Sequence, residues 1–323
     1  MSSYPIYDYD QTAIEEMGGF VYPELIMRND DPTIDDIYAE KELKTTLENI
    51  LNSICYKKIY DFLGVSPPKS FLLYGEPGTG KTHTVRCLAN TIANKADKDD
   101  NLKGNAVAFL EYDIGKYGTK YINEGSTTLQ KYFDMGRDLL GARNIHSVIY
   151  FFDECDSIMK ERGTGHEEND KLLETLMKNL QAINNRDTAE YVFLATNFEK
   201  SLDEASIRSG RVDEKIRFTV PTVRARYMAI TKQITKINEN KYRPIYNYNI
   251  PELTRISEGF NYADIKLGID GALQNKVQQI IREYMTKDGN VSGGYKVCHK
   301  DLKEQFEKIR ENKKLKDTRR IGF

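Results

Sequence analysis

The chain has 323 residues, 39% of them hydrophobic and 30% charged, and its 47 Lys and Arg against 49 Asp and Glu give a formal net charge of −2. This near-neutral balance provides no argument for a nucleic-acid partner, and the lack of an apolar run of about 18 residues argues against a membrane span. The first residues lack the basic and apolar parts of a signal peptide, and the four cysteines have no metal-ligand spacing. We therefore expect a cytoplasmic protein with reduced thiols and about two domains.

Residues 1–32 contain aromatic and acidic side chains that follow no sustained period. Two readings are equally supported: a docking segment that binds an adaptor, or an extension loosely packed on the main domain. After residues 33–37, apolar side chains recur at helical spacing from 40 to 54, which predicts an amphipathic helix. These side chains are Leu43, Leu47, Ile50, Leu51 and Ile54.

The most informative stretch is Gly75-Glu76-Pro77-Gly78-Thr79-Gly80-Lys81-Thr82, which matches the phosphate-binding pattern G-x-x-x-x-G-K-[ST] in full. An apolar run at 71–74 precedes it and a helix-compatible segment at 85–92 follows. Glycines let successive backbone N–H groups turn toward phosphate oxygens, and the helix adds its positive dipole end. Lys81 can reach the β- and γ-phosphates, and Thr82 can place its hydroxyl on Mg²⁺. We expect residues 76–82 to contact ATP, and His83 to lie beside it as a helix residue rather than a catalyst.

Strand-like and helix-like segments then alternate as far as Pro221. The expected strands are 106–110, 148–152, 191–195 and 215–220, and the expected helices are 126–140 and 169–183, with a polar, exposed loop at 94–105. Continuous apolar runs are typical of strands buried on both faces, so the alternation predicts a parallel sheet with helices on both sides. Beyond Pro221 the pattern is nearly all helical, which predicts a small helical domain of about 90 residues.

Two acidic residues end the strand 148–152. Asp153 would hold Mg²⁺, directly or through water, and Glu154 would polarise the water that attacks the γ-phosphate. The alternative reading, a pair of surface acids, loses weight because these acids follow a complete phosphate loop.

Two further elements follow the strand 191–195. Asn197 comes just after it, and strand carboxyl ends line the ligand crevice of a doubly wound sheet, so Asn197 could position the water or sense the γ-phosphate. Arg208 and Arg211 lie in the next loop, and arginine suits the charge that spreads over a transferring phosphoryl group. A turn-forming Asn and a solvated basic turn are the plain alternatives.

The order of these motifs resembles the AAA+ ATPases, in the branch that contains katanin, spastin, the endosomal vacuolar-sorting ATPase and the proteasomal ATPases. The resemblance runs from about Thr33 to about Arg310 and includes the segment Gly259–Ile265, similar to the family's Gly-Tyr-Ser-Gly-Ala-Asp-Ile. It implies an AAA+ large α/β domain, whose parallel sheet lies between helices, followed by a small all-helical lid domain. The implied boundaries are an N-terminal extension at 1–32, the large domain at 33–221, the lid at 222–311 and a basic, loose C-terminal tail at 312–323.

The resemblance also implies how the nucleotide site is completed. Subunits of such proteins form a ring, with a hexamer expected here, and Arg208 and Arg211 would act on the ATP of the neighbouring subunit. Gly259 and Ala263 would lie near the adenine and ribose. The adenine-contacting position, where the family usually has Ile-Gly-Gly, is occupied by Ile37, Tyr38 and Ala39.

A substrate-gripping loop is implied as well. The family pattern Lys-Tyr-Val-Gly-Glu-Ser-Glu is similar to residues 120–126, which would place Tyr121 in a central pore, flanked by Lys120 and Ile122. A ring of aromatic side chains offers apolar contact to any extended polypeptide. A second Lys-Tyr pair ends at Tyr117, and we favour Tyr121 because the helix expected from Ser126 sets the spacing.

The sequence therefore predicts an ATP-hydrolysing, ring-shaped motor that unfolds, translocates or disassembles protein substrates. A nucleotide-gated scaffold or filament is the alternative from another class, and an intact Glu154 is compatible with it if hydrolysis is slow. An AAA+ ATPase that acts on DNA is less favoured, because the overall charge is near neutral and Tyr121 supplies an aromatic pore residue.

Overall fold

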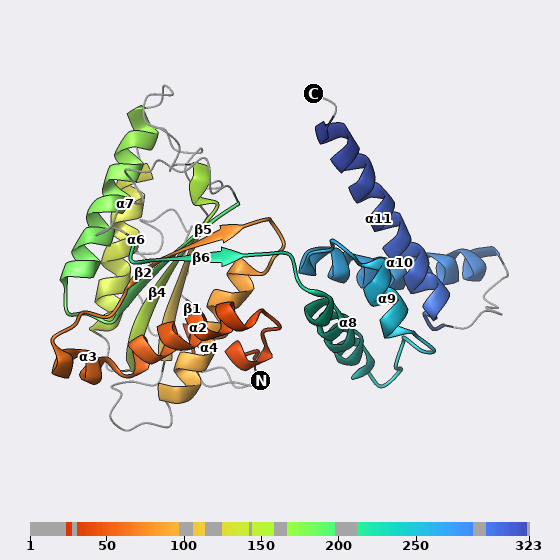
Figure 1. Cartoon of the computed structure of the whole chain (residues 1–323), viewed down its shortest axis with the longest axis horizontal. Coiled ribbons are helices and arrows are strands. Elements are labelled where there is room, and N and C mark those ends of the chain that lie inside the picture. The colour runs from red at the N-terminus through yellow and green to blue at the C-terminus, as the bar shows by residue number, and fades with distance from the viewer. Residues whose placement is uncertain are drawn as a thin grey trace. The chain divides into compact units, whose positions relative to one another are not determined.

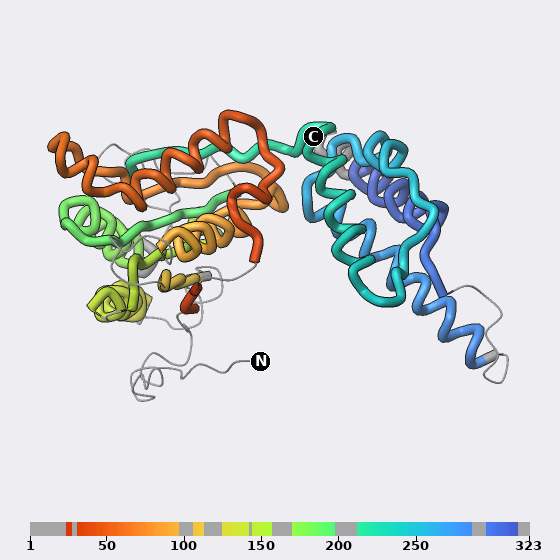
Figure 2. Tube along the Cα trace, turned by 90° about the horizontal axis from the view of Figure 1, so that it is seen from below, coloured from red at the N-terminus to blue at the C-terminus, as the bar shows by residue number. Residues whose placement is uncertain are grey.

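The computed structural model describes residues 24–27, 31–96, 106–113, 125–141, 144–157, 167–197, 212–286 and 295–321. Contacts within the chain divide it into two compact units. The first, a sheet with helices, contains the described residues up to Ile37 together with Lys41–Glu76 and Lys81–Phe218. The second, a helical unit, contains the described residues from Thr219 onward together with Tyr38–Glu40 and Pro77–Gly80. Each unit can be followed by its colours in Figures 1 and 2.

A six-stranded sheet forms the centre of the first unit (Figure 1). Its strands are β1 (Glu24–Ile26), β2 (Ser70–Gly75), β3 (Ala106–Asp113), β4 (Ile145–Asp153), β5 (Glu190–Thr196) and β6 (Glu214–Phe218). Their order in the sheet is β1-β3-β4-β5-β2-β6. Neighbouring strands run parallel from β3 to β6, and β1 pairs antiparallel with β3 at the edge. The predicted α/β fold with a parallel sheet is therefore confirmed, with one antiparallel strand added.

Helices cover both faces of this sheet. They are α2 (Lys41–Cys55), α3 (Lys57–Leu63), α4 (Lys81–Ala96), α6 (Gly125–Leu140) and α7 (Glu167–Asn185), with the 3-10 turns η1 (Ile34–Asp36) and η2 (Cys155–Ser157). Successive residues of β3 point to opposite faces. Leu110 and Tyr112 join a buried cluster with side chains of α6 and α7, whereas Phe109 lies under the guanidinium of Arg86 on α4, 4.8 Å from its ring centre. The helices therefore form a layer on each side, as the continuous apolar runs predicted.

Two parts of this unit differ from the expectations. Residues 24–26 fall within the predicted N-terminal extension, yet they form β1 of the sheet, where Glu24 also pairs with Arg86 at 2.6 Å. A strand of three residues is too short to show a period of two. The helix α3 was not expected. Ile59, Phe62 and Leu63 do stand at helical spacing, but so short a segment gives no sustained period. All three side chains are exposed, Phe62 to 89%.

The second unit is built from helices around a core of its own. They are α8 (Val223–Asn238), α9 (Ile250–Ile256), α10 (Tyr262–Thr286) and α11 (His299–Ile321). Apolar side chains from all of these helices meet in one buried cluster, which includes Ile230, Leu253, Ile269 and Phe306. The predicted small helical domain is therefore confirmed.

The C-terminal segment differs from its prediction. A loose tail was expected at 312–323, but α11 continues to Ile321. Lys313, within that segment, pairs with Asp264 of α10, so a contact in this unit ties α11 to the beginning of α10. The tail was predicted from the basic composition of 312–323, and composition alone does not show whether a preceding helix continues through such a segment. Within the described ranges, no helix is long and apolar enough to cross a membrane.

Candidate nucleotide site

The sheet brings the carboxyl ends of β4, β5 and β2 next to one another. From β2 the chain passes through α4 to β3, whereas from β5 it passes on to β6, on the other side of β2. The chain therefore leaves two neighbouring strands in opposite directions, and ligands of doubly wound sheets bind at such a reversal. The residues at these strand ends are Lys81 beyond β2, Asp153 at the end of β4 and Asn197 beyond β5.

Gly75 begins the phosphate loop in a position that a larger residue does not fit. Its backbone φ is 147°, and a Cβ on it would lie 2.0 Å from the carbonyl oxygen of Phe218 on β6. The pairing of β2 with β6 continues to this residue, so the chain turns out of the sheet directly beside its neighbour. The close approach of two backbones therefore requires glycine here.

Lys81 is the side chain at which these strand ends meet. Its Nζ donates hydrogen bonds to the Gly75 carbonyl at 2.7 Å, to the Glu76 carbonyl at 3.2 Å and to Oδ1 of Asn197 at 2.8 Å. Lys81 is 7% exposed, and burial lowers the pKa of its ammonium group, while the nearby Asp153 carboxylate acts in the opposite direction. The ammonium group is thus held in place beside the phosphate loop, where it can bind an oxyanion.

Thr82 and Asp153 form the second pair at this end of the sheet. The Thr82 hydroxyl donates to Oδ2 of Asp153 at 3.1 Å, and Oδ1 of Asp153 accepts from the backbone N–H of Glu154 at 2.9 Å. Mg²⁺ is usually bound by one or two carboxylates together with substrate phosphates. A hydroxyl beside a carboxylate fits this ion. The described residues hold no cluster of three His, Cys, Asp or Glu side chains that would bind a metal without substrate.

Glu154 is exposed next to Asp153, and its backbone has a φ of 53°. Positive φ is uncommon for a residue other than glycine and is retained where the surrounding structure requires it. The sharp turn after β4 therefore supports a functional reading of Glu154 rather than that of an ordinary surface acid.

Two acidic residues to which the sequence assigned no role stabilise this arrangement. Asp156 in η2 accepts a hydrogen bond from the Thr196 hydroxyl at 3.1 Å, which joins the end of β4 to the end of β5. Asp213 accepts at 2.8–3.0 Å from the backbone N–H groups of Lys69 and Ser70 and from the Ser70 hydroxyl, at the amino end of β2. Both partners lie far away along the chain, so motif spacing could not reveal these contacts.

In the helical unit, loop residues 77–80 lie against the beginning of α10. Asn261 and Asp264 cap this helix reciprocally, because each side chain accepts the backbone N–H of the other, at 2.8 and 2.9 Å. Nδ2 of Asn261 also donates to the Pro77 carbonyl at 2.9 Å, and the N–H of Tyr262 donates to the Gly78 carbonyl at 3.0 Å. The cap of α10 is thus also a support for the phosphate loop.

Residues 71–220 match the family described as "ATPase family associated with various cellular activities (AAA)". The chain carries an AAA domain. The match begins in β2 and ends just beyond β6, so it covers the strands whose ends hold Lys81, Asp153 and Asn197.

Curated relatives of this chain include components named for the proteasome. A 26S proteasome regulatory subunit 6A from Encephalitozoon cuniculi is 30% identical over 266 residues, which are 80% of this chain and 58% of the relative. A proteasome-activating nucleotidase from Methanopyrus kandleri is 30% identical over 241 residues, 73% of this chain and 50% of the relative. A 26S proteasome regulatory subunit 4 homolog B from Arabidopsis thaliana is 29% identical over 231 residues, 70% and 46% respectively. The chain spans about half the length of these curated relatives. The predicted AAA+ branch is confirmed.

The AAA domain brings some of the predicted residues together. Lys81, Thr82, Asp153 and Asn197 contact one another in two pairs, and Glu154 adjoins them. Other residues that were predicted to contact the nucleotide do not join these pairs. Ile37 is buried in the first unit, and His83 is exposed, with its Nε2 3.5 Å from Sγ of Cys87.

In the helical unit, the N–H of Ala263 is bonded to the Gly78 carbonyl at 3.4 Å. The Tyr38 carbonyl accepts the Tyr262 hydroxyl, and Ala39 follows it, half-buried. Gly259 has a φ of 75° and open space around its Cα, and no contact places it at the phosphate loop. Six predicted residues lie outside the described ranges: Tyr117, Lys120, Tyr121, Ile122, Arg208 and Arg211.

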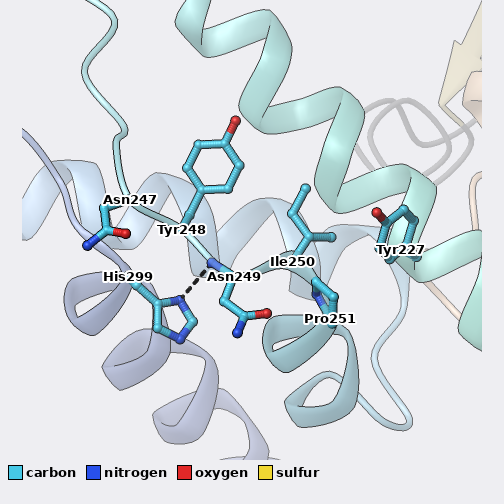
Figure 3. A pocket seen from close by; sticks show the side chains of 7 residues that line it. All are labelled: Tyr227, Asn247, Tyr248, Asn249, Ile250, Pro251 and His299. Atoms are coloured by element: carbon cyan, nitrogen blue, oxygen red, sulfur yellow. Dashed lines mark hydrogen bonds between the residues drawn. The ribbon is translucent and has the colours of Figure 1, made fainter.

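A hollow of about 610 Å³ lies elsewhere on the helical unit, and Figure 3 shows its lining residues. Nδ1 of His299 accepts from the backbone N–H of Asn249 at 3.3 Å, and its Nε2 lies 2.9 Å from Glu252. The hollow is therefore bordered by a hydrogen-bond network internal to the unit. The residues predicted from the motifs do not line it; those that do are Tyr227, Asn247, Tyr248, Asn249, Ile250, Pro251 and His299.

Proposed function

We propose that this protein hydrolyses ATP, with Mg²⁺, at the carboxyl end of its parallel sheet. The observation that carries the proposal is the meeting of three strand ends in two pairs, Lys81 with Asn197 and Thr82 with Asp153. If Lys81 only stabilised the fold, there would be no reason for a hydroxyl and a carboxylate suited to Mg²⁺ to lie beside it. Phosphoryl transfer needs a cation on the phosphates, a metal position and a polar group near the nucleophile. In this proposal Lys81, the Thr82–Asp153 pair and Asn197 take these roles.

Each residue takes a distinct role in this proposal. Lys81 exchanges neutral carbonyl acceptors for the charged β- and γ-phosphate oxygens, which form stronger hydrogen bonds. Because Oδ1 of Asn197 faces Lys81, Nδ2 is the atom left to orient the attacking water or the γ-phosphate. Glu154 accepts a proton from that water as the general base. Mg²⁺ held by Thr82 and Asp153 would neutralise charge that develops on the phosphates.

We further propose that Arg208 and Arg211 act on the nucleotide of a neighbouring subunit. Asp213 is bonded to Lys69 and Ser70 at the amino end of β2, whereas Lys81 follows the carboxyl end. The six residues of β2 separate these ends by about 17 Å. Arg211 precedes Asp213 by two residues, so the covalent chain favours a target other than its own phosphate loop.

The wider proposal is a ring of identical subunits, with six expected, that pulls protein substrates through a central pore. Proteasome regulatory subunits and proteasome-activating nucleotidases are among the named relatives, and these names support a protein substrate. Lys120, Tyr121 and Ile122 would grip the polypeptide, and an adaptor would bind within the N-terminal region 1–32. The same names lend no support to a scaffold or to a DNA-acting ATPase.

The decisive experiment measures phosphate release and ATP binding for the full chain and for Glu154→Gln. We expect Glu154→Gln to bind ATP, to lose at least about 100-fold in turnover and to accumulate as an ATP-bound ring. Glu48→Gln changes an exposed glutamate of α2 in the same way and should leave turnover intact. A wild-type chain that binds ATP without hydrolysing it would overturn the proposal, and unchanged turnover in Glu154→Gln would remove Glu154 from the mechanism.

A further inference from the structure

Two segments of the helical unit lie side by side, one between α8 and α9 and the other at the beginning of α11. Ile245 forms a parallel bridge with Val297, and two backbone hydrogen bonds of 2.8 and 3.0 Å join the segments there. Further along, the N–H of Asn249 donates to Nδ1 of His299 at 3.3 Å. We call the surface of these two segments, residues 241–249 and 295–300, the basic tyrosine surface.

The basic tyrosine surface combines exposed aromatic and basic side chains, and neither of its segments contains an acidic residue. Its tyrosines are between 38% and 68% exposed. Glu252, which borders it, is already paired with His299 at 2.9 Å and with Lys303 at 2.8 Å. The excess of positive charge therefore favours an acidic partner. The exposed aromatic and basic residues are Tyr242, Tyr246, Tyr248, Tyr295, Lys241, Arg243, Lys296 and Lys300.

The loop that carries most of these side chains is held in place from within the unit. Ile245 is 2% exposed, and its backbone N–H and carbonyl are both bonded to the side-chain amide of Asn238, at 3.0 and 2.9 Å. Arg243 and Asn247 have backbone φ values of 42° and 47°, which are uncommon for residues other than glycine and persist where the surrounding structure requires them. A backbone that is ordered in advance loses less entropy when a partner binds.

The hollow of about 610 Å³ adjoins this surface (Figure 3). Tyr248 and Tyr227 of α8 both line it, and Ile250 and Pro251 lie between them in this view. Aliphatic walls suit an apolar side chain of a polypeptide better than a base of a nucleic acid, which gains most from stacking on aromatic rings. The hollow therefore favours a peptide over a single-stranded nucleic acid as the acidic partner.

We propose that the basic tyrosine surface binds an extended, acidic segment of another protein. Carboxylates of that segment pair with the four basic side chains, its backbone lies across the tyrosines, and one of its apolar side chains enters the hollow. Tyrosine and arginine dominate many protein–protein contacts, and tyrosine offers a large contact area while losing little rotamer freedom. Binding at this surface needs no nucleotide, so the inference does not depend on the proposed function.

The test measures binding of a labelled peptide to the full chain by fluorescence anisotropy. The probe is a short synthetic peptide in which Asp and Glu alternate with Leu and Phe. A second peptide has Asn and Gln in place of the acids, and a single-stranded oligothymidylate competes with the probe. We expect the acidic peptide to bind about tenfold or more tightly than its amide counterpart, and its affinity to fall as salt is added. Failure of the acidic peptide to bind would overturn the proposal.

Charge reversal locates the binding site. Lys296→Glu combined with Lys300→Glu should weaken the acidic peptide by about tenfold or more, because both attractions become repulsions. Lys266→Glu combined with Lys308→Glu changes two exposed lysines of α10 and α11 in the same way and should bind nearly like the wild type. Equal losses in the two double variants would show a general effect of net charge and would contradict a specific surface.

Removal of single tyrosines tests the aromatic contacts. Tyr242→Ala and Tyr295→Ala should each weaken the acidic peptide by about fivefold or more, with unchanged thermal unfolding because both side chains are exposed, to 68% and 66%. Tyr284→Ala, which removes a tyrosine of α10 that is 60% exposed, is the matched control and should bind like the wild type. Unchanged affinity in both surface variants would exclude the tyrosines from the contact.

Two other occupants would also overturn the proposal. An oligothymidylate that binds more tightly than the peptide, and is lost in the same variants, would identify a nucleic-acid surface. Residues 1–23 contain four acidic residues and neither Lys nor Arg. If changing these acids to Asn and Gln in the full chain made the peptide bind more tightly, the chain's own segment would be the occupant.

Discussion

Nζ of Lys81 lies 2.8 Å from Oδ1 of Asn197, although the two residues are 116 positions apart in the sequence. The contact exists because β2 and β5 are direct neighbours, paired in parallel from Ser70 to Tyr74. It connects the cation that would bind phosphate to the amide that would read the γ-phosphate. The same hydrogen bond decides which atoms of Asn197 remain for a ligand, so this residue is the sharpest single test of the site.

Replacing Asn197 by alanine should reduce ATP turnover by at least about tenfold while leaving ATP binding nearly intact. Without Asn197, the Gly75 and Glu76 carbonyls still hold Lys81 beside the loop until the phosphates replace them. The phosphate contact therefore survives, whereas the group that orients the water is lost. The measurement is kcat and KM for ATP, together with ATP affinity. Asn52→Ala, at an exposed position of α2, is the matched control. A drop in affinity with unchanged kcat would contradict the role given to Asn197.

Rings made only of Arg211→Ala subunits should not hydrolyse ATP. Mixtures of Arg211→Ala with Glu154→Gln subunits should recover part of the activity. In a mixed ring, a subunit with an intact Glu154 can receive the arginine of a Glu154→Gln neighbour. Random mixing of equal amounts would complete about a quarter of the sites at a head-to-tail interface. Phosphate release as a function of mixing ratio is the measurement. The trans role would be wrong if every mixture stayed inactive although mixed rings had formed.

Tyr121→Ala should separate ATP hydrolysis from work on protein substrates. The aromatic side chain would supply the grip on an extended polypeptide, and its loss leaves the nucleotide residues untouched. We expect ATP turnover within about twofold of the wild type and a loss of substrate unfolding, followed with a fluorescent protein that carries an unstructured tail. Tyr117→Ala is the matched control, since it changes the neighbouring Lys-Tyr pair. If Tyr117→Ala lost substrate unfolding and Tyr121→Ala kept it, the pore contact would be Tyr117 instead.

Gly136→Ala should destabilise the sheet unit by about 1–3 kcal/mol through overpacking. A Cβ at Gly136 would lie 2.1 Å from the Tyr150 hydroxyl, which is buried and bonded to the Phe133 carbonyl and to Glu190. Neither the helix α6 nor the strand β4 can yield easily in so dense an aromatic cluster. Urea unfolding followed by circular dichroism measures the change.

Gly125→Ala is the control for this stability prediction. It adds the same methyl group to the beginning of α6, where the nearest side-chain atom, from Leu172, is 3.7 Å away, an ordinary contact. We expect its unfolding midpoint to stay close to that of the wild type. If both variants unfolded alike, the clash with Tyr150 would not be the cause.

The local features of this protein were determined by the sequence alone. The loop from Gly75 to Thr82, the acids after β4 and the alternation of strands and helices each depend on residues a few positions apart, where spacing translates directly into geometry. The expected strands and long helices therefore formed close to their predicted bounds. The exceptions were β1 and α3, both of which are too short to show a sustained period.

Only the tertiary structure decided which of these features meet. The order of the strands brings Asn197 into contact with Lys81, Asp213 with the start of β2, and Asp156 with Thr196. No local pattern encodes a partner that lies far along the chain. The same holds for Tyr262, whose helical period assigns it to α10 without indicating that its ring lies beside Gly80. Periodicity reveals which face of an element is buried, but the identity of the partner depends on how distant segments pack, because that packing alone brings their side chains within contact distance.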